Sequence, residues 1–266
     1  MGRALLGRGG NVLIAVLDSK DVVSEAQRVH GTYPTPTALL GRLLTGAALY
    51  SLTYRGSRPV LITFEVISDG PVRHAVAQVK GRRLRGYVRN PHVRAEPRKG
   101  KLAVSDIVGK GILRVVRDSY VSEVPLVSGE VGEDIAHFFY QSEQRRTAVG
   151  LGVLVGEYGE VLSAGGFIVE ALPGATEEEI GRIEERIGEL SVSRFLMERD
   201  VRSLFEYLGG ERVVEETEYR YDCWCNYEGV RRIVLTMEGR GKDEKVVARC
   251  MFCRREYVID LREGSG

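Results

Sequence analysis

All four cysteines of the chain lie between residues 223 and 253. They form two close pairs, a C-x-C pair at Cys223 and Cys225 and a C-x-x-C pair at Cys250 and Cys253. The segment that contains them, from residue 211 to the end, is charged and poor in large aliphatic side chains. Segments of fewer than about 40 to 60 residues rarely build a stable core without a metal, a disulfide or a partner. The cysteines are the candidates for what stabilises this segment.

Two thiolate pairs at this separation predict one tetrahedral zinc site, with metal–sulfur bonds of about 2.3 Å. Structural zinc contributes about 10–16 kcal/mol of folding free energy, which is comparable to the whole stability of a domain, about 5–15 kcal/mol. Oxidation of either pair would remove thiolates from the metal, and a disulfide closed across the C-x-C pair would be strained and labile. The same residues can therefore be a structural site when reduced and a trigger for unfolding when oxidised. The histidines, to which we assign no role, all lie upstream: His30, His74, His92 and His137.

Composition places the chain among soluble globular proteins, with 43% hydrophobic and 28% charged residues. The sequence contains no apolar run of membrane-spanning length and begins without a secretory signal, so we expect a cytoplasmic protein. In that reducing compartment, close thiols are expected to be ligands or redox groups. The net charge of +1 predicts attraction neither to nucleic acid nor to a membrane. We assign the basic runs at 80–85 and 98–101 to solvated surface.

The first 175 residues predict an α+β domain, because strands and helices come in clusters and do not alternate strictly. We expect strands at 11–19, 59–67, 72–80, 82–90, 111–119 and 122–129, and a hairpin at 147–172 that turns near Gly159. Helices are expected at 19–31, at 35–52 with Thr35 as N-cap and Pro36 as its first residue, and at 128–144 with Ser128 as N-cap.

Residues 176–210 predict a helical linker, which precedes a C-terminal module at 211–266. Thr176 and Glu179 form a capping box, and Asp200 and Gly209 are expected to begin and end a later helix. The first linker helix carries one narrow apolar stripe, and this stripe consists of Ile180, Ile183, Ile187 and Leu190.

Motifs along nearly the whole chain resemble those of the redox-regulated thirty-three-kilodalton heat-shock chaperone family. They include "CWC…CMFC", "GYVRNPHV", "SGEVGEDIAHFFYQSEQ" and "AGGFIVEALPGA". The resemblance implies an ATP-independent holding chaperone, not an enzyme, that is inactive when reduced and zinc-bound. On oxidation it implies disulfides Cys223–Cys225 and Cys250–Cys253, loss of zinc, and an active homodimer that binds unfolding clients. The chain departs from the family in a shorter spacing between its cysteine pairs and in Asn226, where a serine is more usual.

We hypothesise that oxidation unmasks the apolar stripe as the client-binding surface, since exposed apolar area is what an unfolded protein would bind. Further candidates for exposure are Phe195, Leu196, Leu204 and Phe205. The first alternative is a zinc-ribbon protein that binds nucleic acid, and the second is a thiol–disulfide oxidoreductase, although the C-x-x-C pair lacks a βαβ setting. The third is an enzyme with a structural zinc tail. Against it, the glycine-rich stretches match neither the dinucleotide-binding nor the phosphate-loop spacing.

Overall fold

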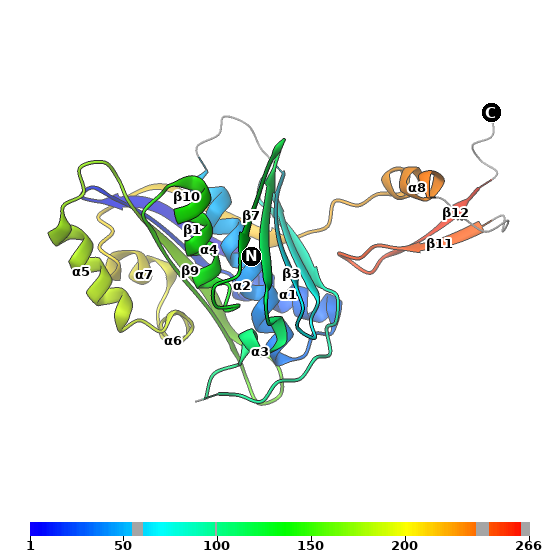
Figure 1. The fold of residues 1–266 in the computed structure, drawn as a ribbon, viewed down its shortest axis with the longest axis horizontal. Coiled ribbons are helices and arrows are strands. Elements are labelled where there is room, and N and C mark those ends of the chain that lie inside the picture. The colour runs from blue at the N-terminus through cyan, green and yellow to red at the C-terminus, as the bar shows by residue number, and fades with distance from the viewer. Residues whose placement is uncertain (55–60, 99, 238–244, 262–266) are drawn as a thin grey trace. The chain divides into compact units, whose positions relative to one another are not determined.

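A computed structural model describes residues 1–54, 61–98, 100–237 and 245–261. Its contacts divide the chain into two compact units, Met1–Tyr221 and Asp222–Gly266 (Figure 1). The three-part division at 175 and 210 remains a prediction. The first unit includes the linker helices and also residues 212–221, which the sequence assigned to the C-terminal module. No helix within the described residues is long and apolar enough to span a bilayer.

One ten-stranded sheet, with strand order β7-β6-β3-β4-β5-β10-β1-β2-β9-β8, organises the first unit. Within the described residues, β10 and β5 pair in parallel at two positions, and all the other neighbouring strands pair antiparallel. The strands are β1 (Gly2–Gly9), β2 (Val12–Asp18), β3 (Leu61–Ser68), β4 (His74–Lys80), β5 (Arg83–Val88), β6 (Gly111–Arg117), β7 (Tyr120–Pro125), β8 (Thr147–Val155), β9 (Val161–Ala171) and β10 (Arg212–Tyr221). The expected strands are present, with 59 and 60 outside the described residues, and the mixed architecture confirms the α+β class.

Helix α2 (Pro34–Thr53) forms the centre of this unit, because it is buried around nearly its whole circumference. It packs against β3, β4 and β5 in one half of the sheet and against β2, β8 and β9 in the other, and α1 (Lys20–His30) lies beside it (Figure 1). The expected cap at Thr35 is wrong. The helix begins at Pro34 after Tyr33, whose carbonyl accepts from the Thr37 N–H, and Thr35 is buried inside the first turn.

The helix expected from Ser128 begins later, at Gly132, because a carboxylate organises the preceding loop. Asp134 Oδ1 accepts backbone N–H groups of residues 127–129 at 2.8–3.3 Å, and Oδ2 accepts that of Val131 at 2.9 Å. Val131 is held in the left-handed region at φ 68°. Helix α4 (Gly132–Phe138) continues as a π-helical turn, η1 (Phe139–Glu143). The short α3 (Val104–Val108) also belongs to this unit.

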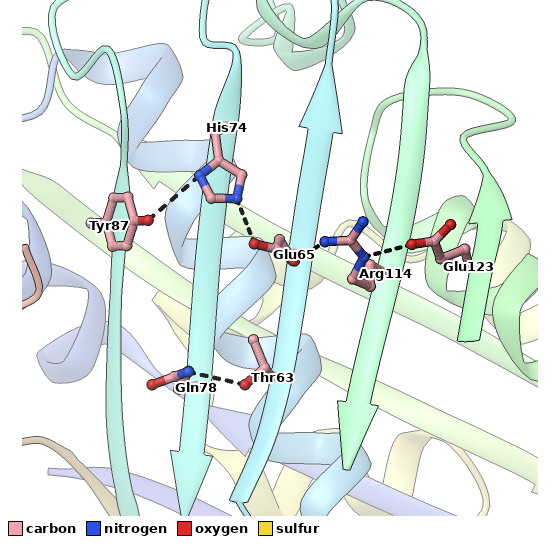
Figure 2. Close-up of polar contacts among 7 residues, drawn as sticks. All are labelled: Thr63, Glu65, His74, Gln78, Tyr87, Arg114 and Glu123. Carbon is pink, nitrogen blue, oxygen red and sulfur yellow. Dashed lines mark hydrogen bonds and ion pairs between the residues drawn. The ribbon is translucent and has the colours of Figure 1, made fainter. Parts of the chain in front are cut away.

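The outward face of β3, β4, β5 and β6 carries a row of polar side chains (Figure 2). Glu65 accepts hydrogen bonds from His74 Nε2 at 2.7 Å and from Arg114 at 3.1 Å, and Arg114 also donates to Glu123 at 2.6 Å. Arg85, from the basic run at 80–85, donates to Gln78 at 2.8 Å. Arg85 and Arg114 therefore both have partners within the sheet.

Three helices cover the face of β1, β2 and β9 that points away from α2 (Figure 1). They are α5 (Glu177–Gly188), α6 (Val192–Glu198) and α7 (Val201–Tyr207). The capping box is confirmed, since Thr176 N–H donates to Glu179 at 2.8 Å and Glu179 N–H donates to Thr176 Oγ1 at 3.2 Å. Asp200 caps α7 by accepting the Ser203 N–H at 2.8 Å. Gly209, at φ 93°, follows the end of α7.

The second unit is a helix and a hairpin: α8 (Tyr227–Thr236), β11 (Lys245–Arg249) and β12 (Glu256–Asp260). Among its described residues, the buried hydrophobic side chains are Val234, Tyr257 and Ile259. So small a core agrees with the expectation that apolar burial alone does not stabilise this segment. Residues 238–244 and 262–266 of the expected module lie outside the described residues.

Candidate metal centre

The four cysteines lie on two segments of the second unit. Cys223 and Cys225 lie on the irregular segment before α8, and Cys250 and Cys253 lie on the turn between β11 and β12. Hydrogen bonds from Cys250 N–H to the Arg255 carbonyl and from Arg254 N–H to the Cys250 carbonyl, both 2.9 Å, hold that turn. Antiparallel pairing of the hairpin strands therefore fixes where both of its cysteines project.

The four sulfur atoms lie within 4.8 Å of one another. Cys223 Sγ is 3.8 Å from Cys250 Sγ, and Cys225 Sγ is 3.4 Å from Cys253 Sγ. A tetrahedral ion with metal–sulfur bonds of about 2.3 Å requires sulfur–sulfur distances of about 3.8 Å. None of the four thiols is in a disulfide, and all four are half-buried. The four cysteines singled out by their sequence spacing thus lie close enough together to hold one metal ion.

Local interactions shift the pKa values of Cys250 and Cys253 in opposite directions. The neighbouring Cys223 thiol lowers the pKa of Cys250, with help from the backbone N–H groups of Cys253 and Phe252, whereas burial raises the pKa of Cys253. Four thiolates this close would repel one another strongly. A divalent cation supplies the compensating charge when bound, which is the physical reason for a metal at this position.

Sequence analysis missed the contact of Tyr257 with the centre, and it noted Asn226 without recognising that this residue caps a helix. The Tyr257 hydroxyl lies 3.1 Å from Cys225 Sγ, and its side chain is only 9% exposed. Asn226 Oδ1 accepts the Gly229 N–H at 2.8 Å as the N-cap of α8. The capping role could have been found, because asparagine is as good an N-cap as serine. Asn226 therefore caps the start of α8 as a serine at the same position would.

The apolar stripe is half-buried along its length, and its last residue, Leu190, lies just beyond the end of α5 at Gly188. Ile183, Ile187 and Leu190 pack on the cluster that β1, β2 and β9 form with α6 and α7, yet no α5 residue is fully buried. A cavity of about 130 Å³ remains beneath the helix, lined in part by Ile180 and Ile183. Of the further candidates, Leu196, Leu204 and Phe205 are buried and Phe195 is partly buried. The stripe is thus a covered but loosely packed surface.

Comparison with known proteins agrees with this arrangement. A family model described as Hsp33 protein matches residues 3–260. Curated relatives named 33 kDa chaperonin include one from Thermus thermophilus, 38% identical over 99% of this chain and 85% of its own length. Another, from Geobacillus kaustophilus, is 35% identical over 97% of this chain and 94% of its own length.

The fold is also similar to a solved structure. The crystal structure of a 33 kDa chaperonin (heat shock protein 33 homolog) from Thermotoga maritima superposes with a TM-score of 0.89. It is 34% identical in sequence, and the match covers 98% of this chain and 95% of that one. The resemblance drawn from the motifs is confirmed, and the chain belongs to the Hsp33 family.

Proposed function

We propose that the protein is a redox-regulated, ATP-independent holding chaperone, inactive while its four cysteines bind one zinc ion and activated when they are oxidised. The observation that carries the proposal is the convergence of four half-buried thiols in a unit whose described residues include three buried hydrophobic side chains. In so small a unit, metal binding and folding are one equilibrium. Whatever removes the thiolates also removes most of what keeps residues 222–261 folded.

The chemistry of activation balances with hydrogen peroxide as the oxidant. A thiolate sulfur attacks one peroxide oxygen, the O–O bond breaks, and hydroxide leaves a sulfenic acid behind. The neighbouring thiolate then attacks that sulfur, the S–O bond breaks, and a second hydroxide leaves as the disulfide forms. Two disulfides therefore consume two peroxide molecules and release four hydroxide ions. The pairing Cys223–Cys225 and Cys250–Cys253 stays a prediction, because all four sulfurs are within reach of one another.

Unfolding clients would bind the stripe Ile180, Ile183, Ile187 and Leu190 once α5 leaves the sheet. Two observations support this role: no α5 residue is fully buried, and a cavity remains beneath the helix. Such a short helix is marginal without its docking surface, so it can be released at modest cost. Ile183→Asp with Ile187→Asp should abolish holding after oxidation. Wild-type holding by that variant would exclude the stripe as the client surface.

The rest of the proposal concerns partners and location. We propose a homodimer in the oxidised state, a reducing cytoplasm as the compartment that keeps the thiols available, and no role for nucleic acid or a membrane. The nucleic-acid alternative would use the basic runs, and Arg85 and Arg98 of those runs have partners in Gln78 and Asp106. A thiol–disulfide oxidoreductase would be identified by catalytic turnover in an insulin-reduction assay.

The deciding experiment follows metal and activity in the same samples. Reduced full-length protein is treated with mild peroxide at elevated temperature while a colorimetric chelator reports zinc release, and aliquots are assayed for suppression of aggregation of a heat-denatured client. The fluorescence of Trp224, the chain's single tryptophan, reports on the C-x-C pair. We expect one zinc per chain to be lost in step with the gain of holding. Zinc loss without a gain of holding activity would show that the cysteines form a structural site only, and the chaperone proposal would be wrong.

A further inference from the structure

The side chain of Tyr257 links the hairpin of the second unit to the first cysteine pair. Tyr257 lies in β12, opposite Ala248 of β11, and its ring belongs to the small core with Val234 and Ile259. Its hydroxyl lies 3.1 Å from Cys225 Sγ, within hydrogen-bond distance for a sulfur acceptor. A buried hydroxyl needs a hydrogen-bond partner. Because a thiolate can only accept, the hydroxyl of Tyr257 donates to Cys225 Sγ when Cys225 is deprotonated.

Hydrogen-bond donors reach sulfurs of both cysteine pairs. In the C-x-x-C pair, backbone N–H groups of Phe252 and Cys253 act on Cys250, and that of Arg255 acts on Cys253. In the C-x-C pair, the hydroxyl of Tyr257 contacts Cys225 Sγ.

Arg255 is the cation nearest in sequence to this hydroxyl, and Tyr257 is the main cause of the raised pKa of Arg255. A guanidinium can only donate, so it does not compete with Cys225 Sγ for the hydroxyl hydrogen.

We propose that Tyr257 is a positioning residue of the metal centre, which stabilises the Cys225 thiolate and thereby sets how tightly the cluster holds its metal. The inference rests on the metal-binding part of the proposed function. A cluster of four thiolates around a divalent cation carries a net charge of −2, so each donor to sulfur lowers the repulsion among the ligands. Loss of an outer-shell partner of this kind typically costs about 10–100-fold in metal affinity.

The test compares Tyr257→Phe with Tyr227→Phe in the full-length reduced protein. Tyr227 belongs to the same unit and is 37% exposed, and no hydrogen bond to its hydroxyl is recorded within the described part of the chain. Zinc affinity is measured by chelator competition, and the cobalt-loaded proteins are compared by absorption spectroscopy. For Tyr257→Phe we expect 10–100-fold weaker zinc binding and a thiolate-to-cobalt charge-transfer band shifted to lower energy, because a thiolate without its donor gives up electron density more easily. Tyr227→Phe should match wild type in both.

An unchanged charge-transfer band and unchanged affinity in Tyr257→Phe would overturn the proposal. So would an equal loss of affinity in both variants, which would indicate a general effect on folding. If Tyr257→Phe fails to fold, 3-fluorotyrosine at position 257 retains the ring and donates more strongly, and its band must shift to higher energy; no shift there refutes the inference. None of these measurements uses holding activity, so the inference and the chaperone proposal can fail separately.

Discussion

Truncation of the α5 stripe should release this helix from the sheet while the rest of the first unit stays folded. The perturbation is Ile183→Ala with Ile187→Ala, two side chains that pack on the cluster beneath α5 without being fully buried. An isolated helix of 12 residues is marginal in water. The helical state of α5 therefore depends on this docking.

The size of the effect follows from burial. Truncation of a fully buried isoleucine to alanine costs about 2–5 kcal/mol, and half-buried side chains lose about half of that. For two neighbours, whose effects need not add, this gives about 2–4 kcal/mol. If α5 opens locally, the protection of its amides against hydrogen exchange should fall about 30- to 1,000-fold.

Hydrogen exchange with mass spectrometry on the reduced protein measures this directly, with peptides from α5 compared with peptides from β2 and β9. The control is Glu185→Ala, which removes an exposed side chain from the same helix. It should leave protection unchanged or slightly raised, because alanine favours helix. If the double variant lost protection equally in α5 and in the sheet, α5 would be part of the global folding unit, and the reasoning about selective release would be wrong.

Three further outcomes are expected. Cys253→Ser, or a strong chelator on the wild type, should abolish stoichiometric zinc binding and exchange protection at 222–261 while the sheet stays protected; retained protection there would contradict a metal-dependent fold. Backbone N–H groups of Thr176 and Asn11 lower the pKa of Glu179. The Glu179 carboxylate therefore stabilises α5 fully above its ordinary pKa of 4.5, and this stabilisation is lost as the pH falls through the lowered pKa of the folded state. Glu179→Gln should remove this acid dependence of α5 protection, and an unaltered pH profile would refute the assignment. Tyr221→Phe removes a hydroxyl that donates to the Gly86 carbonyl at 2.7 Å and should lower the unfolding free energy of the first unit by about 1–3 kcal/mol, seen as a lower Tm; an unchanged Tm would count against it.

Features with a local cause could be predicted from the sequence. The hairpin strands at 72–80 and 82–90 and the capping box at Thr176 depend on neighbours in the chain, and the structure confirms them. The four cysteines come together as their spacing predicts. The start of α4 was wrong because Asp134 organises a loop that precedes its own helix, whereas the sequence rule considers only the serine. Tyr257 was missed because its contact with Cys225 spans 32 residues and depends on the hairpin register.

The strands that the sequence did not reveal, β1 and β10, show why long-range pairing is hard to read. β1 contains glycines and arginines, and half of the residues of β10 are charged, with two buried side chains, Thr217 and Tyr219. Neither has the apolar alternation of an independent strand. β1 pairs with β2 on one side, and on the other side it pairs with β10, which is far from it in the sequence, with Gly2 opposite Tyr219. No local pattern could indicate that pairing.

The position of β10 bears on how far unfolding of the cysteine unit can spread. β10 lies between β1 and β5, and it pairs with β5 only at Arg220 and Tyr221, directly before the segment that carries the first cysteine pair. Loss of order that passed Tyr221 would remove the strand between the two halves of the sheet and expose an edge on each. Tyr221 is fixed at this point by bonds to the Gly86 carbonyl and to His30 Nε2, at 2.7 and 2.9 Å. These two bonds hold β10 at the residue where any loss of order that starts in the second unit would first reach the first unit.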